Sequence, residues 1–246
     1  MIQLTVALPV WNSKSILWLA LEGLCRQKVS FKWELLIMEE QIKEFGIDEV
    51  TKYAKRLEAA GCASLRYMAL EYRVPLPHKW KSMADKRSAS SKAFLLQAAD
   101  DYPDAGRLQR TFDKINEGYD WVQHRRGYMY GIKYKKIIEF DQRTFGPGCR
   151  TGFYIGISTK ELHKLPDSFL SHGIDNWLYR SLQPKKVFWF EEELIGAVGT
   201  DGLNNISIQR RRNYVKPERP FVASDKTIDQ IVPSDIAERL KKFAIK

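Results

Sequence analysis

The chain has 246 residues, of which 44% are hydrophobic and 28% are charged. This composition excludes a disordered or fibrous protein, and no uncharged run approaches the roughly 18 residues needed to cross a bilayer. The formal net charge of +10 favours polyanionic partners such as nucleic acid, pyrophosphate or an anionic membrane surface, although a solvated basic face gives the same balance.

The first hundred residues alternate between strand and helix patterns. Short apolar runs predict strands, and apolar residues at helical spacing predict helices. The predicted strands are residues 4–8, 35–38, 65–68 and 93–96, and the predicted helices are residues 16–24 and 50–60. This alternation implies right-handed crossovers and a largely parallel sheet. Because such sheets bind ligands beyond the carboxyl ends of their strands, the residues after each strand are candidates for chemistry.

The second half has a different pattern. Residues 121–140 are rich in Tyr, Lys and Ile and are broken by glycines, which predicts short, partly antiparallel strands. Short helices are predicted at residues 158–165 and 174–182, a strand at 187–190, and a last helix at 236–243.

Aromatic, amide and acidic side chains follow three of the predicted strands. They are Pro9, Trp11 and Asn12 after the first, Glu39 and Glu40 after the second, and Asp100 and Asp101 after the fourth. Carboxylates gathered at one edge repel one another unless a cation or hydrogen-bond donors offset them, and oxygen ligands suit Mg²⁺ or Mn²⁺. A metal there would neutralise a pyrophosphate leaving group. The structural alternatives are a capped turn at Asp100, a solvated loop at Glu39 and a core position for Trp11.

The order of these motifs resembles the family 2 glycosyltransferases and their viral or phage relatives. The family's first strand ends in Pro-aromatic-Asn, its next helix carries a Gln near its end, and its second strand ends in an acidic pair. An Asp-x-Asp motif follows the fourth strand, and an acidic pair opens a later helix. The matching residues here are Pro9-Val10-Trp11-Asn12, Gln27, Glu39-Glu40, Ala98-Ala99-Asp100-Asp101 and Asp175.

The resemblance implies a GT-A fold, in which helices flank a mostly parallel central sheet with a smaller antiparallel part. It also implies an inverting glycosyltransferase that uses a nucleotide-sugar donor and a divalent metal, Mn²⁺ or Mg²⁺. The donor would contact Pro9, Trp11, Asn12, Glu39, Lys79 and Asp100. The metal would be held by Asp100 and Asp101, and Asp175 would be the catalytic base. The first acid of Asp-x-Asp is replaced by Ala98 and no His lies beyond His172, so water would supply more of the metal's ligands.

We expect a single domain over residues 1–246. Residues 1–103 would form the nucleotide-sugar-binding half, residues 104–207 the acceptor-side half, and residues 208–246 a basic tail. The segment from Asn205 to Lys246 has ten Lys and Arg against five Asp and Glu. This excess makes Arg210, Arg211 and Arg212, with Trp177, candidates for contact with the acceptor or a polyanion. A glycan is the first candidate acceptor, and DNA with hydroxymethylated bases, as phage enzymes modify, is the second.

Two other classes of protein stay open. A nucleotidyltransferase of the same fold needs a Gly-rich loop after the first strand, whereas residues 11–15 here contain no Gly. A non-catalytic nucleic-acid binder would explain the charge but not the carboxylates at the strand ends.

The cysteines indicate a reducing compartment. Cys25, Cys62 and Cys149 are odd in number and have no metal-binding spacing, so free thiols are expected. The apolar segment 1–21 is interrupted by Lys14 and lacks a basic start, which favours a strand and helix over a signal peptide. We therefore expect a cytoplasmic protein without a membrane span.

Overall fold

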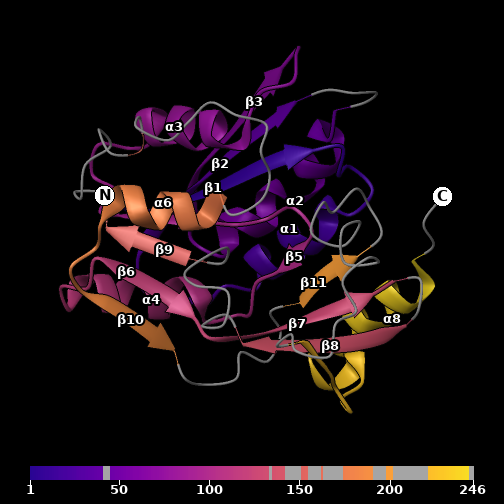
Figure 1. Ribbon diagram of the computed structural model, residues 1–246. Coiled ribbons are helices and arrows are strands. Elements are labelled where there is room, and N and C mark those ends of the chain that lie inside the picture. The colour runs from indigo at the N-terminus through magenta and orange to yellow at the C-terminus, as the bar shows by residue number, and fades with distance from the viewer. Residues whose placement is uncertain are drawn as a thin grey trace.

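A computed structural model describes residues 1–40, 45–132, 135–141, 151–154, 162, 174–190, 198–201 and 221–243. The helices are α1 (Leu17–Cys25), α2 (Ile47–Ala59), α3 (Leu76–Lys86), α4 (Arg107–Asn116), α6 (Ile174–Leu182), α8 (Ser234–Lys242) and the 3-10 helix η4 (Ile228–Gln230). The strands are β1 (Ile2–Trp11), β2 (Lys32–Glu40), β3 (Cys62–Leu70), β4 (Ala93–Leu96), β5 (Asp101–Tyr102), β6 (Trp121–His124), β7 (Arg126–Gly131), β8 (Lys136–Asp141), β9 (Thr151–Tyr154), β10 (Val187–Phe190), β11 (Val198–Asp201) and β12 (Phe221–Ala223). Figure 1 shows their arrangement.

Within these residues the larger sheet has seven strands, in the order β10-β6-β9-β4-β1-β2-β3. Strands β3, β2, β1 and β4 are parallel to one another, as the alternating pattern predicts. Strand β9 is antiparallel to both of its neighbours, β4 and β6, so β6 runs in the same direction as β4. The carboxyl ends of β1, β2, β4 and β6 therefore meet at one edge of this sheet.

A smaller sheet, in the order β12-β8-β7-β11-β5, extends from that edge. It is antiparallel except where β11 pairs with β7. It supplies the smaller antiparallel part that the resemblance implies. Strand β5 begins at Asp101, so the second predicted acidic residue after β4 belongs to this smaller sheet.

Strands β1 and β2 are longer than the apolar runs that predict them, and the predicted strand ends are wrong here. Pro9 and Trp11 lie within β1, and Glu39 and Glu40 are the last two residues of β2. The physical reason is pairing on both sides, because Trp11 is in register with Glu40 and Glu40 with Leu70. Backbone hydrogen bonds between the paired strands therefore extend β1 and β2 beyond their apolar runs to include these polar residues.

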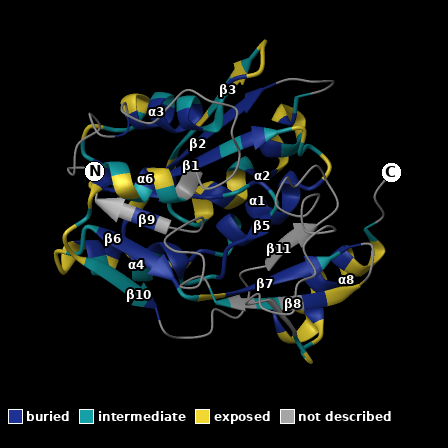
Figure 2. Ribbon diagram, in the orientation of Figure 1, coloured by how far each residue is buried: buried dark blue, intermediate teal, exposed yellow. Residues whose placement is uncertain are grey.

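Each strand of the central sheet sends alternate side chains to opposite layers. In β1 the residues Leu4, Val6, Leu8 and Val10 join one core with α1, α2 and α4, whereas Ala7 joins a second core with α3 and α6. Burial is near-continuous along β1, β2 and β4, which is typical of a parallel sheet covered on both faces. Figure 2 shows β1 and β2 largely in dark blue. The result is a three-layer α/β arrangement.

Helix α3 is not predicted by the sequence pattern. It begins after Pro75 and has basic residues through its length, which suggest a surface segment. The structure buries Trp80, Met83 and Ala84 against the sheet, and Pro77 lies in the first turn, where a missing N–H costs nothing. Tertiary packing rather than an obvious amphipathic stripe therefore stabilises this helix.

The C-terminal helix α8 packs back against the N-terminal half. The Arg239 guanidinium lies 3.8 Å from the centre of the Trp18 ring, Asp235 pairs with Arg26, and the Phe243 ring lies 6.4 Å from that of Trp18. These contacts hold residues that are far apart in sequence next to one another. None of the helices in the described ranges has the length and apolar character of a membrane span.

Candidate active site

The carboxyl edge of the central sheet carries several of the residues that the sequence singles out. Trp11 is level with Glu40 across β1 and β2, and Leu96, the last residue of β4, is level with Ala7. Residues 97–101 follow β4 at the same edge. In an open α/β sheet this edge is where ligands bind.

Trp11 is the last residue of β1 and lies beside a basic residue from another segment, and Asn12 follows it. The Arg73 guanidinium lies 4.3 Å from the centre of the half-buried Trp11 ring. The buried Nε1 of Trp11 has no hydrogen-bond partner among the described residues. Asn12 is exposed and has a φ of 46°, a left-handed conformation that Asn tolerates better than most residues. Arg73 is not among the predicted site residues, and its only signal in the sequence is its place after the third strand.

Glu39 is held inside the fold. It is 1% exposed and accepts hydrogen bonds from the Tyr67 hydroxyl and from the Gly46 N–H at 2.8 Å. Burial, together with the bond to Glu39, raises the pKa of Tyr67 far above its usual value, so this hydroxyl stays a donor at neutral pH. Nucleoside contact by Glu39 remains a prediction.

Glu40 and Lys79 form a buried ion pair at the same edge. The Lys79 Nζ lies 2.9 Å from Glu40 Oε1 and donates to the Val10 carbonyl at 2.7 Å. The other Glu40 oxygen accepts the Val74 N–H. Burial lowers the pKa of Lys79, and Glu40 opposes that shift. Lys79 therefore joins α3 to β1 and β2 from the interior, and donor contact by it remains a prediction.

Asp100 lies in the turn between β4 and β5, and Asp101 is the first residue of β5. Asp101 is 9% exposed and Asp100 is half-buried. In the part of the chain that the structure describes, no cluster of three or more His, Cys, Asp or Glu side chains could hold a metal. Metal binding by Asp100 and Asp101 remains a prediction.

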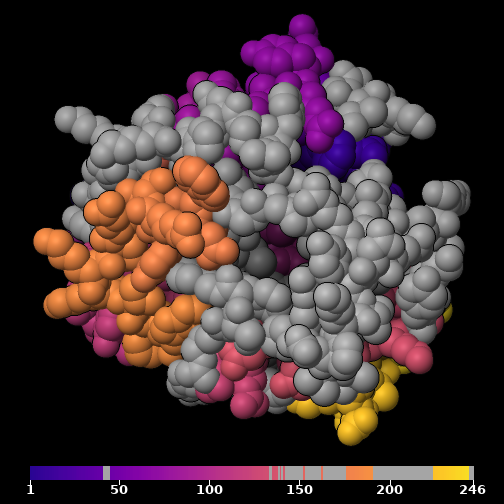
Figure 3. Space-filling view, in the orientation of Figure 1, coloured from indigo at the N-terminus to yellow at the C-terminus, as the bar shows by residue number. Residues whose placement is uncertain are grey.

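Helix α6 covers the second core beside β9 and carries Asp175 and Trp177 (Figure 1). Its Leu178 and Leu182 are buried with Ala7 and Phe94 of the sheet, whereas Trp177 is 54% exposed. Figure 3 shows α6 in orange on this face of the molecule. Asp175 is in the first turn, where the helix dipole favours a carboxylate. The side chain of Asp175 lies outside the described part of the structure, as do Arg210, Arg211 and Arg212.

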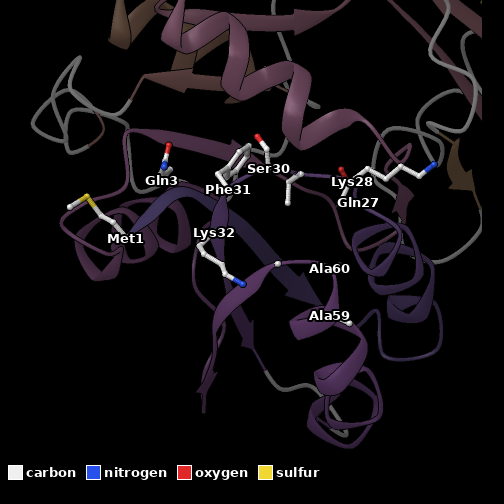
Figure 4. Close-up of a pocket in the computed structure, with 11 residues that line it drawn as sticks. Met1, Gln3, Gln27, Lys28, Ser30, Phe31, Lys32, Ala59 and Ala60 are labelled. Carbon is white, nitrogen blue, oxygen red and sulfur yellow. The ribbon is translucent and has the colours of Figure 1, made fainter.

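A hollow of about 550 Å³ lies at the other end of β1 and β2. Its lining includes Gln3, Lys28 and Lys32, near the amino ends of these strands (Figure 4). It lies away from the residues at the carboxyl edge. We therefore assign the candidate active site to the carboxyl edge and not to this hollow.

Comparison with solved structures finds similar folds at low sequence identity. One is S. aureus TarS 1-349 in complex with UDP-GlcNAc, with a TM-score of 0.64, 14% identity, and coverage of 82% of this chain and 59% of that one. A structure of S. aureus TarS has a TM-score of 0.64, 13% identity, and coverage of 81% and 37%. The mannosyltransferase PcManGT from Pyrobaculum calidifontis, in complex with GDP-Man and Mn²⁺, has a TM-score of 0.61, 12% identity, and coverage of 86% and 60%.

These likenesses confirm the predicted GT-A fold. The chain spans 37% to 60% of the length of these three structures. No protein-family model matches the chain, and no curated protein matches it in sequence.

Proposed function

We propose that this chain is an inverting glycosyltransferase that moves a sugar from a nucleoside-diphosphate sugar to an acceptor hydroxyl. One observation carries the proposal: Trp11, Glu39 and the Asp100–Asp101 turn lie at the carboxyl edge of a sheet whose fold is shared with structures bound to UDP-GlcNAc and GDP-Man. An aromatic ring suits a nucleobase, and an acidic turn suits a metal that bridges to a diphosphate.

The metal belongs to this proposal as well. Asp100 and Asp101 would hold Mn²⁺ or Mg²⁺ together with oxygens of the donor diphosphate. The bound ion would offset the negative charge that builds on the leaving group.

In the proposed reaction the acceptor oxygen attacks the anomeric carbon as the bond from that carbon to the diphosphate oxygen breaks. Asp175 takes the proton of the acceptor hydroxyl, and the nucleoside diphosphate leaves with the bonding electron pair. A carboxylate with an ordinary Asp pKa of about 3.9 is ionised at neutral pH and can act in this way.

The acceptor is a glycan or polysaccharide in the first form of the proposal. The basic segment after Asn205 supports a second form, in which the acceptor is DNA with hydroxymethylated bases. DNA would need several Lys or Arg contacts with phosphates and a base exposed or flipped from the duplex. Binding of duplex DNA at about 50 and 200 mM salt separates the two, because phosphate contacts weaken steeply with salt. Weak or salt-insensitive binding would exclude DNA as the acceptor.

The activity test is release of nucleoside diphosphate. The protein is incubated with UDP-GlcNAc, UDP-glucose or GDP-mannose and Mn²⁺, with EDTA as the control. We expect slow Mn²⁺-dependent release even with water as acceptor. Release of pyrophosphate from a nucleoside triphosphate and a sugar phosphate would instead indicate a nucleotidyltransferase. If neither activity nor nucleotide binding is detected, the remaining alternative is a non-catalytic nucleic-acid-binding protein.

A further inference from the structure

A buried arginine lies directly beneath the acidic turn. Arg107, the first residue of α4, is 3% exposed. Its guanidinium donates to the Leu96 carbonyl at 2.8 Å and to Gln97 Oε1 at 2.5 Å. Burying a guanidinium is costly unless its N–H groups are satisfied, and these two acceptors satisfy N–H groups on Nη1 and Nη2.

Gln97 connects this arginine to the backbone of the turn. It is 1% exposed, and its Nε2 donates to the Ala98 carbonyl at 2.9 Å and to the Asp101 carbonyl at 2.8 Å. Its backbone N–H donates to the Ala7 carbonyl of β1 at 3.0 Å. The side-chain amide of Gln97 therefore closes the turn that contains Asp100, and its backbone N–H ties the start of that turn to β1.

Arg107 determines which way the Gln97 amide faces. A guanidinium can only donate, so it must meet the oxygen of the amide and not the nitrogen. With the oxygen directed to Arg107, both N–H groups are directed to the Ala98 and Asp101 carbonyls. If the amide were reversed, donor would face donor and acceptor would face acceptor at every contact.

The segment beyond the turn is anchored by other residues. Gln27 Nε2 donates to the Asp104 carbonyl at 2.7 Å, and its Oε1 accepts the Leu108 N–H at 3.0 Å. Pro103 lies so close to α1 that a Cβ on Gly23 would be 2.4 Å from its Cδ. These contacts do not involve Gln97 or Arg107, so α1 and α4 should stay packed when the turn loosens.

We propose that Gln97 and Arg107 are positioning residues that fix the Asp100–Asp101 turn for the donor diphosphate and its metal. This inference rests on the proposed function for its ligand, a nucleoside diphosphate with Mn²⁺. The two residues act through the backbone of the turn. Each of their side chains is nearly fully buried and makes its contacts inside the protein.

The sharpest variant is Gln97→Glu. It keeps the size of the side chain and an oxygen for Arg107, but it places a second oxygen against the Ala98 and Asp101 carbonyls. Arg107→Met removes the guanidinium, and Arg107→Lys keeps the charge but has a single donor nitrogen. The matched control is Glu34→Gln. Glu34 is also 1% exposed and bonded to Thr5, Arg66 and the Ser88 N–H, but it lies six residues before the end of β2.

Two measurements are made on every variant. Hydrogen exchange of the peptide spanning residues 97–106 should speed up at least about tenfold in Gln97→Glu and Arg107→Met, with β1 and β2 unchanged. Calorimetric titration with UDP or GDP should show at least about tenfold weaker binding in the presence of Mn²⁺ and little change in EDTA. Arg107→Lys should lie between Arg107→Met and the wild type, and Glu34→Gln should change neither measurement.

An unchanged hydrogen-exchange rate of residues 97–106 in Gln97→Glu would refute the proposal that Gln97 and Arg107 fix the turn. Faster exchange with unchanged Mn²⁺-dependent affinity would refute the link to the donor. If the wild type binds neither nucleotide with Mn²⁺, the proposed function and the link to the donor both fail. The exchange rates still decide whether these residues hold the turn.

Discussion

The buried ion pair between Lys79 and Glu40 gives a prediction about stability. Replacing Lys79 with Met keeps the length and most of the volume of the side chain but removes its charge. Glu40 would then be a carboxylate that is 4% exposed, with the Val74 N–H as its remaining hydrogen-bond donor among the described residues. An uncompensated buried charge is among the few single changes that cost several kcal/mol.

The magnitude follows from the geometry. At 2.9 Å and an effective dielectric constant of about 20, the attraction between the two charges is about 6 kcal/mol. In the intact pair, the cost of desolvating the two charges offsets much of this attraction. The variant still desolvates Glu40 but loses the attraction. We therefore expect Lys79→Met to lower the free energy of unfolding by about 3–5 kcal/mol. The double variant Lys79→Met/Glu40→Gln should recover part of that loss, because no buried charge is left.

Urea denaturation measures the effect, provided that the m-value stays constant. The matched control is Lys52→Met. Lys52 lies 2.8 Å from Glu49, nearly the same separation, but its side chain is 68% exposed. An exposed pair contributes at most about 1 kcal/mol, so the control should change little. A loss below about 1 kcal/mol in Lys79→Met, or a double variant less stable than the single one, would refute the reasoning.

Three further predictions concern the metal, the base and a thiol. Asp100→Asn should keep the thermal midpoint and abolish Mn²⁺-dependent nucleoside diphosphate release, because an amide is a much poorer ligand for a hard cation. Asp175→Asn should reduce turnover at least about 10²-fold while the donor Kd stays nearly unchanged, because only proton transfer is lost. Burial raises the pKa of the Cys62 thiol to about 11 from its ordinary 9.0, so the unfolded chain ionises first as pH rises above 9. Stability should therefore be intact below pH 9 and fall by roughly 2–3 kcal/mol between pH 9 and 11, and Cys62→Ala should remove that part of the loss in urea titrations at each pH.

Each of these has an outcome that contradicts it. Activity of Asp100→Asn in EDTA would exclude the metal role. Equal losses of donor binding and turnover in Asp175→Asn would place that residue in the donor site instead. Identical dependence of stability on alkaline pH in the wild type and in Cys62→Ala would show that burial does not raise the pKa of the Cys62 thiol.

The first half of the fold and the edge that carries the candidate site could be predicted from the sequence. Strand β4 and helix α6 have the predicted bounds, because a short apolar run and a helical repeat are local signals. The parallel sheet followed from the alternation of strands and helices. Helix α3 and the antiparallel position of β9 could not be predicted. They depend on the packing of α3 against the sheet and on the pairing of β9 with β4 and β6, which are contacts between residues distant in sequence.

The site shows the same division in its side chains. The sequence by itself determined that Trp11, Glu39 and the Asp100–Asp101 turn lie at strand ends, because strand direction and connection order fix that edge. Only the tertiary structure decided that Lys79 is paired in the interior and that Arg107 lies beneath the turn. A basic residue has the same local signal on a surface as in a buried network. Its environment is set by carbonyls and carboxylates from strands that are distant in sequence, and these meet only when the chain folds.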